Sequence, residues 1–236
     1  MGDDVRGITR LVEPESQTLQ PAQRMRITFA KGGAARFISH LDVTRALERA
    51  FNRAALPLAY SQGFNRRPRL SLAAALPLGY TSEAEIADVW LVEPLAPQNF
   101  LEQLSPMMPP GITVVSAAEV PLAAPSLQQQ LAESIYVVRF MSQVDPAELE
   151  ARVGSMMAAD SLIYERTRAK AKRPQPIDLR PLILDMRVDS REEGAPVLHL
   201  RLVHTATQTG KPDDVLAAMG IDPLDTYIHR TALRLV

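Results

Sequence analysis

The 236-residue sequence contains no cysteine, and this absence removes several kinds of chemistry at once. Disulfides, zinc ribbons and iron–sulfur clusters need cysteine sulfur, and so does a thiol nucleophile. Four histidines are present, but no two of them have the H-x-x-x-H spacing that a metal-binding pair needs. The sequence therefore predicts no metal and no cofactor bound by this chain.

Long apolar runs and targeting signals are lacking as well. No stretch approaches the ~18 apolar residues of a membrane-spanning helix, and residues 1–23 are too acidic and polar for a signal peptide. We expect residues 1–23 to be a flexible leader and the protein to be cytoplasmic. With 46% apolar and 22% charged residues, the remainder has enough apolar material for a folded core.

Basic residues are missing from residues 76–120, which carry six acids and a net charge of −6. Residues 24–75 instead hold ten lysines and arginines against two acids, a net of +8, although the whole chain has a formal charge of −1. A second basic run occupies residues 166–180. Two basic segments on a nearly neutral chain indicate local fields directed at a polyanion such as RNA. The alternative interpretation is that the lysines and arginines of these segments simply lie on solvent-exposed faces.

The hydrophobic periodicity predicts the same order of elements twice. Residues 24–120 read as strand, helix, strand, strand, helix and strand, and residues 134–236 repeat this order. Residues 121–133 form the expected linker, and residues 166–181 form a basic insertion in the second unit. We therefore expect an α+β protein made of two tandem ferredoxin-like units with antiparallel sheets.

A helix over residues 39–55 presents the first candidate surface. Ser39 and Asp42 are spaced as in a capping box at its start, and Pro57 follows its end. The expected buried stripe consists of Leu41, Thr44, Leu47, Phe51 and Ala54. Three arginines follow one another at i, i+4 and i+8 and should project from one face: Arg45, Arg49 and Arg53.

The loop YSQGFNRRPR, residues 60–69, combines aromatic rings, amides and arginines. Aromatic rings stack on bases and arginines bind phosphate, so this composition is typical of contact with single-stranded nucleic acid. The opposing interpretation makes Tyr60 and Phe64 buried anchors of the loop and leaves the arginines merely exposed. The candidate binding residues are Tyr60, Gln62, Phe64, Asn65, Arg66, Arg67 and Arg69.

The second basic run, RTRAKAKRPQPIDLR, alternates cations with other residues at its start. In an extended chain this spacing places four cations on one side. The pattern fits either an arm that grips a phosphate backbone or lysines that protect an edge strand. We expect it to converge with the first basic segment on a shared surface. Its candidate residues are Arg166, Arg168, Lys170, Lys172, Arg173 and Arg180.

His40 is the candidate for chemistry, because it stands beside Ser39 in the first turn of the predicted helix. A histidine there is either an acid, a base or an anion ligand, or a structural residue. No P-loop, nucleophile elbow or metalloprotease motif occurs in the sequence, so nothing in it identifies an enzyme. A metal-independent endoribonuclease that uses His40 stays open as an alternative to a binding protein.

Two motifs, FISHLD at residues 37–42 and LPLAYSQGFN at residues 56–65, closely resemble the bacterial radical SAM-linked protein family. Residues 177–181 and 210–216 are also similar to its pattern, and the resemblance covers residues 24–236. After Gly-Phe the family has Asn-Pro-His-Pro, whereas this chain has NRRP. If the family histidine has a chemical role, this chain lacks it.

The resemblance implies a partnership rather than a reaction. Members of the family are fused to, or encoded beside, a radical SAM protein of the cobalamin-binding type. This chain lacks the three cysteines that would hold a radical SAM cluster, so the radical enzyme would be a separate chain. The implied role is an accessory that binds or presents the substrate, with tRNA or rRNA as the expected class. A protein-only scaffold for the radical SAM enzyme is the remaining alternative.

Overall fold

The computed structural model describes residues 20–62, 65–166, 175–190 and 195–236. The protein is a mixed α+β structure with one large, mostly antiparallel sheet and few helices. Within the described residues, no helix has both the length and the apolar character to cross a membrane.

The N-terminal half follows the element order predicted for it. Its elements are β1 (Gln23–Lys31), α1 (His40–Arg53), β2 (Leu70–Leu72), β3 (Thr81–Leu91), α2 (Pro97–Leu104) and β4 (Ile112–Val120), with 3-10 turns at Gly33–Phe37 and Ser105–Met107. β1 lies between β4 and β3, and β2 pairs with the other edge of β3. The strand predicted over residues 69–76 is much shorter, because only three of its residues pair as β2.

The C-terminal half also keeps its predicted order, with a small extra hairpin. Its elements are α3 (Leu127–Gln130), β5 (Leu131–Phe140), α4 (Pro146–Ala158), β6 (Ile163–Arg166), β7 (Gln175–Asp178), β8 (Ile183–Asp189), β9 (Val197–Val203), α5 (Pro212–Ala218) and β10 (Thr226–Leu235), with 3-10 turns at Arg180–Leu182 and Pro223–Asp225. The strands β10, β5, β9 and β8 are neighbours in that order, and β6 and β7 form a separate two-stranded sheet.

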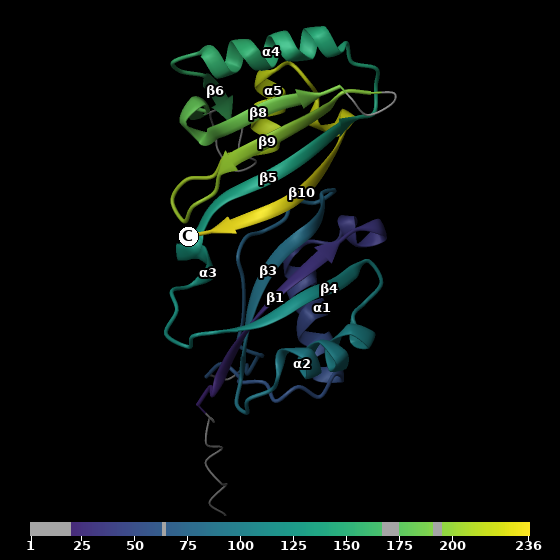
Figure 1. Ribbon diagram of the computed structural model, residues 1–236, viewed down its shortest axis with the longest axis vertical. Helices are drawn as coiled ribbons and strands as arrows, with labels where there is room; N and C mark the ends of the chain where they lie inside the picture. Colours follow the sequence, from purple (N-terminus) through teal and green to yellow (C-terminus); the bar gives the residue numbers. More distant parts are fainter. Residues whose placement is uncertain (1–19, 63–64, 167–174, 191–194) are drawn as a thin grey trace, which may run out of the picture.

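The two halves share one continuous sheet, and this differs from the expected pair of separate sheets. β3 and β10 pair in parallel, with Thr81 opposite His229 and Ser82 opposite Arg230. The pairing is possible because β3 has eleven residues, whereas β2 covers only the part around Val89. The uncovered start of β3 is therefore an open edge, and β10 occupies it. Figure 1 shows the junction, with α1 and α2 below it and α4 and α5 above it.

Each half buries its own core against one face of the sheet. In the N-terminal half, Met25, Ile27 and Phe29 alternate along β1 and pack with α1 and α2 through residues such as Phe51 and Phe100. This alternation leaves the intervening side chains of β1 on the other face of the sheet. A second core under α4 and α5 contains Tyr136, Val138, Leu149, Leu200 and Leu216.

The predicted linker, residues 121–133, packs against the rest of the protein. Its α3 carries Leu127, which is buried with Leu131, Leu233 and Ala73 in a small third cluster. Arg24 fixes the segment further, since its guanidinium donates to the carbonyl oxygens of Ala124 (2.6 Å) and Pro125 (2.9 Å). The linker thus covers part of the sheet face that the helices leave open.

A buried ion pair crosses the junction between the halves. Arg230 on β10 donates to both carboxylate oxygens of Glu85 on β3, at 2.9 and 3.1 Å, and both side chains are almost completely buried. Its other terminal nitrogen donates to the Tyr136 hydroxyl and to the Ala75 carbonyl oxygen. Burial opposes the charged form of Arg230, but the Glu85 carboxylate and Tyr136 together outweigh it, and the pKa of Arg230 rises.

We predict that Glu85→Gln lowers the free energy of unfolding by about 3 kcal/mol, because it leaves the buried Arg230 charge without a counter-charge. Urea denaturation followed by circular dichroism measures the loss. The exposed pair Arg45–Asp42 serves as the control, where Arg45→Gln should cost no more than about 1 kcal/mol. Equal losses in the two variants would show that the junction does not depend on this pair.

His204, just after β9, is a titratable group held in an apolar environment. Its Nδ1 lies 3.3 Å from the Ser134 hydroxyl, and burial, with a smaller contribution from Arg230, lowers the pKa of His204 to about 4. The folded protein therefore keeps this imidazole neutral down to about pH 4, whereas the unfolded chain takes up a proton below about pH 6.5. His204 therefore contributes its full stabilisation above about pH 6.5, and this contribution is lost as the pH falls towards about 4.

We predict that His204→Asn removes part of the acid sensitivity of folding. Between about pH 7 and about pH 5 the parent should lose about 2 kcal/mol more of its free energy of unfolding than the variant, since asparagine takes up no proton. Urea unfolding at both pH values measures the difference. Identical pH dependence in parent and variant would mean that His204 is protonated alike in the folded and unfolded states.

Candidate nucleic-acid interface

The helix α1 presents the first set of predicted arginines. Ser39 caps it, since its hydroxyl accepts the Asp42 backbone N–H at 3.2 Å. The same hydroxyl donates to the Asp42 carboxylate at 2.7 Å and thereby lowers the pKa of Asp42. The side chains of Arg45, Arg49 and Arg53 are all exposed, as the spacing predicted.

The buried stripe of α1 differs from the predicted one. It consists of Val43, Ala46, Leu47, Ala50 and Phe51. Leu41 was expected inside but is 66% exposed, and Thr44 is only half-buried. The observed stripe follows the i, i+3, i+4, i+7, i+8 pattern of a helix lying on a sheet, and the predicted one departed from it.

Two of the three α1 arginines have partners within the protein. Arg45 lies 3.4 Å from the Asp42 carboxylate, and Arg53 donates to the Met107 carbonyl oxygen at 2.5 Å. For Arg49, the described part of the chain provides no hydrogen bond or ion pair. A polyanion would therefore meet one uncommitted arginine, one in a solvent-exposed ion pair and one bound to a neutral carbonyl.

The predicted loop is a hairpin that is fastened to the end of α1. Its closing bonds run from Arg69 N–H to the Ala59 carbonyl (2.7 Å) and from Ser61 N–H to the Arg67 carbonyl (2.8 Å). The Tyr60 hydroxyl donates to Asn52 Oδ1 of α1 at 2.8 Å. The structure thus brings the hairpin and the C-terminal part of α1 together.

The side chains of the hairpin are mostly exposed. Tyr60 is 38% exposed, so it is neither a fully buried anchor nor a free ring. Five further candidates are exposed, and Phe64 lies outside the described residues; the five are Gln62, Asn65, Arg66, Arg67 and Arg69. Together with α1 they form a surface that we name the α1–hairpin surface, composed of Arg45, Arg49, Arg53, Tyr60, Gln62, Asn65, Arg66, Arg67 and Arg69.

Trp90, which the sequence interpretation missed, contacts Arg69 of the hairpin. The guanidinium carbon of Arg69 lies 4.6 Å from the centre of the indole, and that of Arg24 lies 5.0 Å from it. The alternation of β3 could have indicated its position. Trp90 stands between the buried Val89 and Leu91, so its side chain points to the face of the sheet opposite theirs. Direct pairing of Arg24 with Trp90 across β1 and β3 cannot be read from either strand alone.

The second basic run does not join this surface through its described residues. Arg166 forms an ion pair with Asp214 of α5, and Arg180 donates to the Ile183 carbonyl at 3.0 Å. Both belong to the C-terminal half, and β6 lies above the junction in Figure 1 while α1 lies below it. The expected convergence is therefore wrong for Arg166 and Arg180, because both lie in the C-terminal half, away from α1. Arg168, Lys170, Lys172 and Arg173 lie outside the described residues.

His40 lies at the start of α1, where it lines a small cavity together with Lys31 and Glu85. The cavity has a volume of about 10 Å³, which is room for about one water molecule. Lys31 is 1% exposed, its Nζ donates to the Ile38 carbonyl at 3.2 Å, and burial lowers the pKa of Lys31. The described residues contain no group of three or more acids and histidines placed to hold a metal ion.

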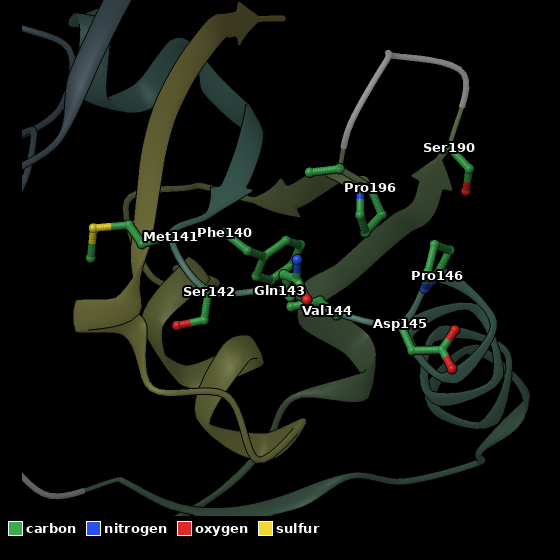
Figure 2. Close-up of a pocket in the computed structure, with 10 residues that line it drawn as sticks. Phe140, Met141, Ser142, Gln143, Val144, Asp145, Pro146, Ser190 and Pro196 are labelled. Carbon is green, nitrogen blue, oxygen red and sulfur yellow. The ribbon is translucent and has the colours of Figure 1, made fainter.

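A wide hollow of about 740 Å³ lies in the C-terminal half, away from the predicted residues. It is formed by the end of β5, the start of α4 and the segments that follow β8 and precede β9. Figure 2 shows Phe140, Gln143 and Val144 at its centre, with Asp145 and Pro146 at the start of α4 to one side. Among the described residues, the lining of this hollow holds no lysine or arginine.

The pattern of a protein family described as "Uncharacterized protein conserved in bacteria (DUF2344)" matches residues 24–212. The chain belongs to this family. The family description names no partner or activity, so the radical SAM partnership remains a prediction. Among curated proteins, none matches the chain.

One solved structure that matches this chain is a chain in the crystal structure of a Cbf5–Nop10–Gar1 complex. The two chains share 10% sequence identity and superpose with a TM-score of 0.48. The match covers 89% of this chain and 48% of the other, so this protein spans about half the length of that one.

Proposed function

We propose that this DUF2344 protein is an accessory RNA-binding protein that presents tRNA or rRNA to a separate radical SAM modification enzyme. The observation that carries the proposal is the meeting of α1 and the hairpin. Two basic segments that the sequence separates by a helix end and a turn are joined by the Tyr60–Asn52 hydrogen bond into one exposed surface. Arginines and an aromatic ring on one surface are typical of single-strand binding.

The charge of the α1–hairpin surface supports the proposal. Its six arginines face two nearby acids, Asp42 and Glu48, which leaves a net charge of +4. Two acids of the stretch that follows are already paired with other arginines. Asp88 is fully buried between Arg24 and Arg26, and Glu85 is paired with Arg230 inside the junction. A local positive field of this kind attracts a polyanion even when the whole chain is nearly neutral.

The strand order supports a finer description of the fold. The N-terminal strands lie in the order β4-β1-β3-β2, and the C-terminal strands in the order β10-β5-β9-β8. When the strands of each half are numbered in chain order, with the separate β6–β7 sheet left out, both orders are 4-1-3-2, as in the split β-α-β arrangement. We propose that the protein consists of two ferredoxin-like halves fused into one sheet, with RNA bound by the first.

Binding fits the site better than catalysis by this chain. His40 shares its cavity with Lys31 and Glu85, and this cavity has room for about one water molecule rather than for a phosphate group. The sequence has no cysteine, so the radical chemistry would belong to the partner enzyme. We therefore propose that this chain binds no cofactor of its own and supplies substrate binding.

We predict that Arg49, Arg66 and Arg67, replaced together by alanine, flatten the salt dependence of RNA binding by about two units. The parent should show a slope of log affinity against log salt of about −3 to −4, because each phosphate contact on a single strand contributes about 0.7. Fluorescence anisotropy of a labelled tRNA or rRNA fragment at several salt concentrations measures both slopes.

A matched control removes the same charge from the C-terminal half. Arg139, Arg187 and Arg234 are exposed arginines of β5, β8 and β10, and replacing them by alanine should leave the slope unchanged. Equal effects of the two triple variants would contradict a specific α1–hairpin surface. Parent protein that binds no RNA at any salt concentration would favour a protein-only scaffold. Cleaved RNA, with cleavage lost in His40→Ala, would favour an endoribonuclease.

A further inference from the structure

Trp90, the only tryptophan of the chain, is bracketed by two arginines. β1 and β2 both pair with β3 at Val89, through Met25 and Leu70, so they lie on its opposite edges. Arg24 comes from β1 and Arg69 from the residue just before β2. Their guanidinium groups therefore reach the indole from opposite sides, at 5.0 and 4.6 Å from its centre.

The inner end of this stack is fixed. Arg24 is 2% exposed, and its guanidinium donates to the Asp88 carboxylate and to the carbonyl oxygens of Ala124 and Pro125. Asp88 in turn is fully buried and also accepts from Arg26. A guanidinium with this many fixed partners holds its plane in place, and the indole beside it is held as well.

The outer end is open. Trp90 is half-buried, and Arg69 is exposed. Within the described residues, the Arg69 side chain has the indole as its contact and no hydrogen bond or ion pair. Its backbone is nevertheless fixed, because Arg69 N–H donates to Ala59 and its carbonyl accepts from Trp90 N–H at 3.1 Å. A fixed backbone with an unpaired planar cation provides a preformed stacking surface.

We infer that Arg69 and Trp90 form a stacking site for one unpaired base of RNA. The base would extend the series from Arg24 through Trp90 and Arg69, while Arg67, two residues away, binds a neighbouring phosphate. Guanidinium planes stack on bases whose faces are free, and the bases of a duplex are already stacked on each other. The site thus assigns single-stranded RNA as the substrate class. This inference rests on the proposed RNA binding.

The test compares two conservative variants on two RNA probes. The probes are a labelled single strand of about 12 nucleotides and a duplex of the same length. Arg69→Lys keeps the charge and removes the planar group, so the single strand should bind roughly two- to fivefold more weakly while the duplex is unaffected. Arg187→Lys on β8 is the matched control, since this exposed arginine lies outside the α1–hairpin surface, and the affinity for the single strand should stay that of the parent.

Trp90 also reports directly, because tryptophan emission from this chain has a single source. Titration of the parent with the single strand should change this emission along the same curve as the anisotropy, and the duplex should leave it unchanged. If the single strand binds with unaltered emission and both lysine variants bind it equally, the stacking site is wrong while RNA binding stands. If neither probe binds the parent, the proposed function and the stacking site are both wrong.

Discussion

The parallel contact between β3 and β10, with the Arg230–Glu85 pair beside it, is the constraint on which the rest of the structure depends. It merges two four-stranded units into one sheet and fixes the position of each half. A buried guanidinium needs a counter-charge and hydrogen-bond acceptors, and Arg230 finds them in Glu85, Tyr136 and Ala75. Those partners come from both halves, so the pair also specifies how the halves join.

The same need for buried charges to be paired decides which arginines are available to a ligand. Arg24 and Arg230 are buried and Arg26 is half-buried, and these arginines form ion pairs with Asp88 and Glu85. Arg166 is satisfied by Asp214. What remains exposed in the N-terminal half is concentrated on α1 and the hairpin, next to the Arg69–Trp90 pair. The proposed RNA surface is therefore the exposed part of the N-terminal basic segment.

The sequence allowed much of the local structure to be predicted, because periodicity and caps are local signals. The order of elements in each half and the exposure of Arg45, Arg49 and Arg53 follow from residue spacing alone. The β3–β10 pairing could not be predicted, since it depends on how far the short β2 covers its neighbour. The partner of Arg166 could not be predicted either, because Asp214 lies 48 residues away on α5. The face to which Trp90 points could have been predicted from the alternation of β3. Its arginine neighbours could not, because they depend on the pairing of β3 with β1 and β2.

The central claim is that RNA contacts the N-terminal half through α1 and the hairpin. Amide hydrogen exchange of the parent protein, with and without a single-stranded RNA, tests it most directly because it reports the backbone of each element separately. We expect slower exchange in the C-terminal part of α1, in the hairpin and at the end of β3 around Trp90, with β8 and β9 unchanged. Protection confined to the C-terminal half, or absent at RNA concentrations that saturate binding, would contradict it.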